Sequence, residues 1–126
     1  MTPAFAAIPE ESRALVTNHH VFGYLAERFG FEVVGAVIPG GTTLAAPSAS
    51  DLAGLVSAVE GTGVPAIFAE SSSPDQLMQV LASEADVHVD VIELFTESLT
   101  ENDGEAPDYL TMMRVNTQRI ATGLTP

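Results

Sequence analysis

The 126-residue sequence contains no cysteine, no tryptophan and no lysine, and its only formally positive side chains are four arginines. Without cysteine the chain has neither disulfides nor a thiolate metal site, so any metal ion must be bound through nitrogen and oxygen atoms. Seventeen acidic residues give a formal net charge of −13, which repels the phosphates of nucleic acids and of anionic membranes. We therefore exclude nucleic acid as a partner. The acidic surplus suits a cation, although carboxylates that keep a surface soluble explain it as well.

Long apolar runs are also missing. No segment approaches the roughly 20 apolar residues that cross a bilayer, and the first twelve residues lack the basic and apolar regions of a secretory signal. We expect a soluble chain with no export signal of its own. A length of 126 residues fits one domain.

Strand-like and helix-like patterns alternate along the chain. Four short segments rich in Val and Ile are bounded by Gly, Pro or Asn and are predicted as strands: 14–17, 32–38, 65–70 and 87–95. The first three are almost continuously apolar, which is typical of parallel strands that are covered on both faces.

Apolar residues at helical spacing follow each predicted strand. The first helix begins after His20 and should end at Gly30, and the second begins within 48–51 and should end at Gly61 or Gly63. A third opens with Ser73 as cap and Pro74 at its first position. The last is predicted to begin at Pro107 and to bury Leu110, Met113, Ile120 and Leu124.

This alternation predicts an α/β fold, a single three-layer domain of about four parallel strands in the order 2-1-3-4 with helices on both faces. In such sheets, ligands bind at the carboxyl ends of the strands, near the point where the strand order reverses. The residues expected at that edge are Asn18, His19, His20, Pro39, Gly40, Glu70, Ser71, Thr96 and Glu97.

Two histidines and two glutamates at this edge are candidate ligands. His19 falls at the first turn of a helix, where the helix N-terminus favours the neutral imidazole that binds metal, but spacing alone favours a histidine that only caps the helix or forms hydrogen bonds in the loop. His20 must point elsewhere, and His88 belongs with the solvated residues of the fourth strand. Glu70 and Glu97 each follow a strand. With His19 they make an incomplete cation site, because zinc usually takes four ligands.

Other chemistry has less support. The acidic segment 101–108 lacks the oxygen spacing of a calcium loop and is predicted to be a solvated turn. The glycines after the second strand form no phosphate-binding motif, and no serine lies in a nucleophile elbow. We therefore predict that the chain is not an enzyme.

Several separated segments resemble a known family. The segments "LVTNHHVFGYLAERFGFEVVGAVI", "IFAESS", "LFTES" and "PDYLTMMRVNTQRIATGL" are similar, in order and spacing, to the C-terminal lobe of the solute-binding proteins of ABC importers that capture zinc or manganese. The resemblance implies that residues 14–126 form this lobe and that residues 1–13 are a remnant of the helix that links the two lobes.

The resemblance also implies which residues hold the ion. In this family the ion lies between two lobes, and each lobe supplies two ligands. The spacing to Gly23-Tyr24 places one ligand on His19, and the ligand that is usually an aspartate after "LFT" falls on Glu97. His20 stands where the family has an acid, and Glu70 matches an acid that supports the site. A histidine in the first position favours zinc over manganese.

The resemblance therefore predicts a metal-binding lobe that supplies half of a site. Its partners would be a divalent metal ion, the missing N-terminal lobe or a second copy of the chain, and the membrane subunit of the importer. The location implied is periplasmic or extracellular. Two alternatives stay open: a truncated α/β interaction module with no ion, in which His19 only caps a helix, and a small α/β enzyme that would use Glu70, Glu97 and His19.

Overall fold

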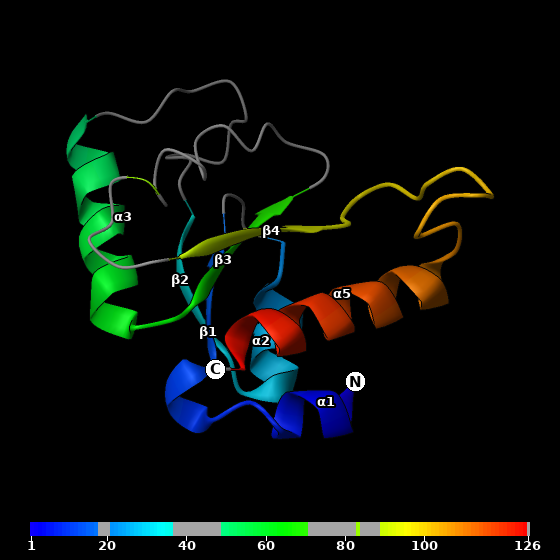
Figure 1. Ribbon diagram of the computed structural model, residues 1–126, viewed down its shortest axis with the longest axis horizontal. Coiled ribbons are helices and arrows are strands. Elements are labelled where there is room, and N and C mark those ends of the chain that lie inside the picture. Colours follow the sequence, from blue (N-terminus) through cyan, green and yellow to red (C-terminus); the bar gives the residue numbers. More distant parts are fainter. Residues whose placement is uncertain (18–20, 37–48, 71–82, 84–88, 126) are drawn as a thin grey trace.

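The computed structural model describes residues 1–17, 21–36, 49–70, 83 and 89–125 (Figure 1). Four parallel strands form a sheet in the order β2-β1-β3-β4, which confirms the predicted fold class and strand order. The strands are β1 (Ala14–Thr17), β2 (Glu32–Ala36), β3 (Ala66–Glu70) and β4 (Asp90–Leu94). The predicted strands at 32–38 and 87–95 run into residues 37–38 and 87–88, which lie outside the described residues.

Strands β1 and β3 form the buried centre of the sheet. All four residues of β1 are buried, and residues 66–69 of β3 are at most 1% exposed. Their apolar side chains are covered on both faces, as the sequence pattern predicts for inner parallel strands. Strand β4 has β3 as its neighbour in the sheet and is less buried, with Asp90 and Glu93 exposed.

The helices lie on both sides of this sheet. Figure 1 shows α3 (Ala49–Thr62) on one side of the strands, with α2 (Gly23–Phe29) and α5 (Tyr109–Leu124) together on the other. Helix α2 ends where predicted, because Gly30 adopts the left-handed conformation (φ 72°) that closes a helix. The predicted helix from Ser73 lies outside the described residues.

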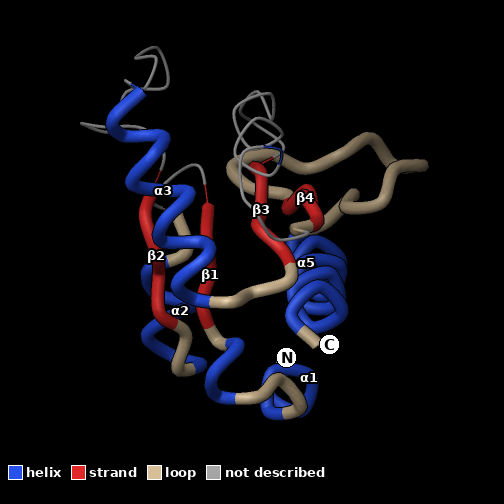
Figure 2. Tube along the Cα trace, turned by 60° about the vertical axis from the view of Figure 1, so that its left-hand side comes forward, coloured by secondary structure: helices blue, strands red, loops and turns tan. Residues whose placement is uncertain are grey.

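The N-terminal segment packs into the same core. It contains α1 (Thr2–Ala6) and the short 3₁₀ helix η1 (Glu10–Ser12), and Figure 2 shows α1 beside the C-terminal end of α5. The ring of Phe5 makes edge-on contacts with Phe29 and Phe31 at centroid distances of 5.0 and 5.1 Å. The assignment of residues 1–13 to an inter-lobe linker remains a prediction.

The prediction for the last helix was wrong in two details. The helix begins at Tyr109, two residues after Pro107, because Asp108 is its N-cap. Leu110 is 65% exposed, since the first turn of α5 extends past the end of β4 (Figure 1) and has no sheet to cover it. Ile120 and Leu124 are buried as predicted, and Met113 is half-buried. In the described part of the chain, no helix has the length and apolarity needed to cross a membrane.

Candidate functional site

The carboxyl ends of the strands meet at one edge of the sheet. Thr17 at the end of β1 is level with Phe68, and Glu70 at the end of β3 is level with Leu94 at the end of β4. The structure therefore places Glu70 at the predicted edge by its backbone. Its side chain is outside the described residues, as are His19, His20 and His88 in full.

Glu97 is the predicted ligand whose geometry the structure does describe. It follows the end of β4 by three residues and is exposed. Its φ is 59°, and no other non-glycine residue in the described ranges has a positive φ. The N–H of Ser98 donates to the carbonyl of Thr96 at 2.6 Å, so Glu97 is the central residue of a three-residue turn.

This conformation is costly for a glutamate. The left-handed region places Cβ against the backbone and costs an L-residue roughly 1–2 kcal/mol. Strained residues persist where the surrounding structure holds them, and they concentrate at functional sites. The strain at Glu97 therefore marks this turn as a candidate site independently of any motif.

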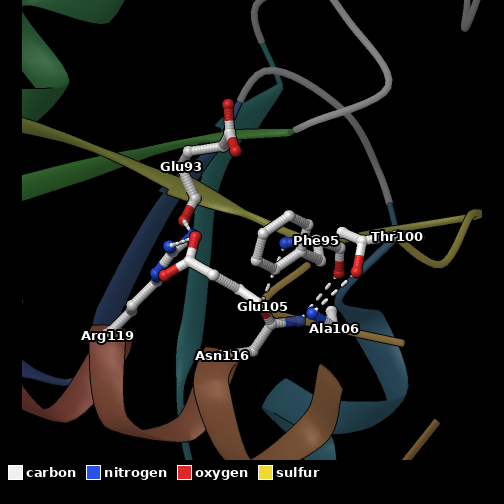
Figure 3. Close-up of polar contacts among 7 residues, drawn as sticks. All are labelled: Glu93, Phe95, Thr100, Glu105, Ala106, Asn116 and Arg119. Carbon is white, nitrogen blue, oxygen red and sulfur yellow. Dashed lines mark hydrogen bonds and ion pairs between the residues drawn. The ribbon is translucent and has the colours of Figure 1, made fainter. Parts of the chain in front are cut away.

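The backbone before Glu97 is held by helix α5 (Figure 3). The side-chain amide of Asn116 accepts from the N–H of Phe95 at 2.9 Å and donates to the carbonyl of Phe95 at 2.7 Å. Arg119, one turn later, donates to the carbonyl of Glu93 at 2.9 Å and lies 4.8 Å from the ring centre of Phe95. Sequence reasoning missed both residues, although an asparagine within the apolar stripe of the last helix was a usable signal.

A largely apolar cleft of about 490 Å³ opens between α2 and α5. Its walls include Val21 and Phe22, which directly follow His20, and Phe95 and Thr96, which directly precede Glu97. The cleft therefore brings together the chain segments next to the two predicted ligands. Tyr24 of the "GY" motif also lines it and is 91% exposed.

Residues 101–105 of the acidic segment form an exposed turn, as predicted, but the segment is closely tied to the fold and Ala106 is buried. Across its base, the backbone N–H of Thr100 donates to the carbonyl of Ala106 at 2.8 Å. Glu105 forms an ion pair with Arg119 at 2.8 Å. Gly104 lies so close to Thr100 that a side chain there would collide with it. Among the described residues, no three His, Asp or Glu side chains gather in a metal-binding group.

Comparison with known proteins identifies the family. The model of the family described as "Zinc-uptake complex component A periplasmic", ZnuA, matches residues 1–123. The chain belongs to the ZnuA family. The chain matches only part of the length of its relatives, which is consistent with the C-terminal lobe that its sequence resembles.

Two curated relatives show how much of such proteins the chain represents. It is 35% identical to the zinc-binding protein TroA of Treponema pallidum over 122 residues, which are 94% of this chain and 39% of TroA. It is 31% identical to the manganese ABC transporter substrate-binding lipoprotein PsaA of Streptococcus pneumoniae, covering 95% of this chain and 38% of PsaA. The chain spans about two fifths of the length of these relatives.

Solved structures agree with the fold. The periplasmic zinc-binding protein TroA superposes with a TM-score of 0.86 at 32% identity, over 99% of this chain and 46% of that one. The cadmium-bound periplasmic metal-binding protein of Candidatus Liberibacter asiaticus gives 0.82 at 27% identity, over 98% and 44%.

Proposed function

We propose that this chain is the metal-binding lobe of an ABC-importer solute-binding protein and that it supplies His19 and Glu97 as half of the metal site. The observation that carries the proposal is the strained turn at Glu97, a carboxylate at the carboxyl edge of the sheet. The cleft supports it, because residues within two positions of each proposed ligand line one cavity. Glu70 and His20 would support the ligands without binding the ion.

The proposed ion is Zn²⁺, with Mn²⁺ as the alternative. An imidazole nitrogen suits zinc, whereas manganese prefers oxygen ligands, and the relatives include both a zinc-binding and a manganese-transporting protein. Glutamate is one methylene longer than the aspartate usual in the family, and it keeps the negative charge.

The proposed ion is cargo, which the full-length protein would capture and deliver to the membrane subunit of an importer. The relatives are named as periplasmic proteins and lipoproteins, so we propose a periplasmic or extracellular location for the parent. The remaining ligands would come from an N-terminal lobe or from another copy of this chain.

The test is a zinc titration of the chain followed by NMR signals of the histidine imidazoles. We expect the His19 signals to shift and saturate, and we expect His19→Ala and Glu97→Gln each to weaken binding more than His20→Ala does. Unchanged His19 signals at millimolar zinc would overturn the proposal and favour the interaction module without an ion. Loss of binding in His20→Ala with binding kept in His19→Ala would transfer the ligand role to His20.

A further inference from the structure

The last paired residue of β4 is Leu94, so the segment that leads to Glu97 leaves the sheet immediately. Phe95 follows, and among the described strands none pairs with it. The amide of Asn116 instead bonds to both its N–H and its carbonyl, at 2.9 and 2.7 Å. An asparagine side chain carries one acceptor and one donor group side by side. The Asn116 amide therefore makes the two backbone hydrogen bonds that a neighbouring strand would otherwise make with Phe95.

Burial makes this contact rigid. Asn116 is 3% exposed and Phe95 is 8% exposed, and a buried amide that loses its partners costs about 1–3 kcal/mol. Arg119 donates to the carbonyl of Glu93 and lies over the ring of Phe95 (Figure 3). Helix α5 therefore fixes the backbone at 93 and 95.

The turn at Glu97 needs such an anchor. A strained φ relaxes unless both sides of the turn are held. On the side before Glu97, Asn116 holds the backbone of Phe95, which is two residues from Glu97. Thr96, between Phe95 and Glu97, is buried. The side after Glu97 is held at Thr100, whose backbone and hydroxyl pair with Ala106.

We propose that Asn116 is a positioning residue for the metal site, which sets the direction of the Glu97 carboxylate by clamping the backbone of Phe95. This inference rests on the proposed role of Glu97 as a ligand. Asn116 lines the same cleft as Val21 and Phe22, so the residue that clamps Phe95 also faces the segment that follows His19.

The test compares Asn116→Leu, which removes both hydrogen bonds, with Thr117→Val. Thr117 is also buried on α5, and its hydroxyl donates within the helix to the carbonyl of Met113 at 2.6 Å. We expect Asn116→Leu to weaken Zn²⁺ binding about tenfold in calorimetry, the scale seen when support around a ligand is removed. Thr117→Val should bind as the unmodified chain does.

A second readout follows the turn itself. The ¹³Cα and ¹³Cβ shifts of Glu97 report its backbone conformation without metal, and they should move in Asn116→Leu and stay fixed in Thr117→Val. If Asn116→Leu does not fold by circular dichroism, Asn116→Ser makes the same comparison with a smaller change. Zinc affinity equal to that of Thr117→Val, with unchanged Glu97 shifts, would overturn the proposal.

A double variant separates this proposal from the proposed function. If Asn116 acts through Glu97, then Asn116→Leu should weaken zinc binding no further once Glu97→Gln is present. A further tenfold loss in that background would contradict the positioning role. If Glu97→Gln alone binds Zn²⁺ as before, the proposed metal site is wrong, while the Glu97 shifts still decide whether Asn116 holds the turn.

Discussion

At the scale of single residues, the most informative position is Glu97, because its backbone conformation is better suited to glycine than to glutamate. Glycine populates positive φ without steric cost, whereas alanine does not. Comparing Glu97→Gly with Glu97→Ala removes the carboxylate in both variants and isolates the effect of Cβ. We expect the glycine variant to be more stable than the alanine variant by about 1 kcal/mol in urea unfolding.

Ser98 supplies the control for this comparison. It is the next residue, it is also exposed, and its φ is not positive. Here Ser98→Gly should be less stable than Ser98→Ala, because glycine gives the unfolded chain more freedom. If Glu97→Ala and Glu97→Gly have the same free energy of unfolding, the turn at residue 97 carries no strain.

At the scale of elements, helix α5 positions the site and begins at a capped end. The carboxylate of Asp108 accepts from the backbone N–H of Thr111 at 2.8 Å and from its hydroxyl at 2.9 Å. These bonds, the backbone bond first, lower the pKa of Asp108 below its usual 3.8. The stabilisation is therefore complete above about pH 3.8 and is lost as the pH falls through the lower pKa of the folded state.

Asp108→Asn should remove this pH dependence. Asparagine also caps helices, so at neutral pH we expect little loss of stability, and on acidification the variant should lose less stability than the unmodified chain. Urea midpoints measured at neutral and acidic pH give the comparison. Asp103→Asn makes the same chemical change in the preceding loop, and an equal effect of the two variants would contradict the role of the cap.

The elements themselves were largely predictable from local sequence. The apolar run at 14–17 matches β1, and Gly30 ends α2, because burial on both faces and a left-handed cap each leave a local signature. Leu110 was placed in the core wrongly, since apolar spacing along a helix does not show where the sheet beneath it stops.

The site was predictable only in part. The residue types at the strand ends, and the family resemblance, pointed to Glu97. The clamp by Asn116 and the strain at Glu97 depend on how α5 packs beside β4, and that contact joins residues 21 positions apart. A polar residue inside an apolar stripe indicates that its side chain has a buried hydrogen-bond partner, but the sequence does not show which residue that partner is.

At the scale of the whole molecule, the proposed site is incomplete and the chain is highly charged. Two protein ligands leave about half of the usual four zinc positions open, and a second copy can fill them with its own His19 and Glu97. We therefore expect zinc to promote a dimer, seen as a faster-sedimenting species that a chelator reverses. Glu97→Gln should remain a monomer at the same zinc concentration.

The net charge determines how the population of this dimer changes with salt concentration. Each copy carries −13, and one bound Zn²⁺ offsets little of the repulsion between two copies. Added salt screens that repulsion, because the Debye length falls from about 30 Å at 0.01 M to about 8 Å at 0.15 M. The zinc-dependent dimer should therefore become more populated as salt rises, whereas simple attraction of a cation to an acidic surface weakens with salt. A monomer at saturating zinc in both salts would show that copies do not complete the site, which leaves its other positions to water or to a different lobe.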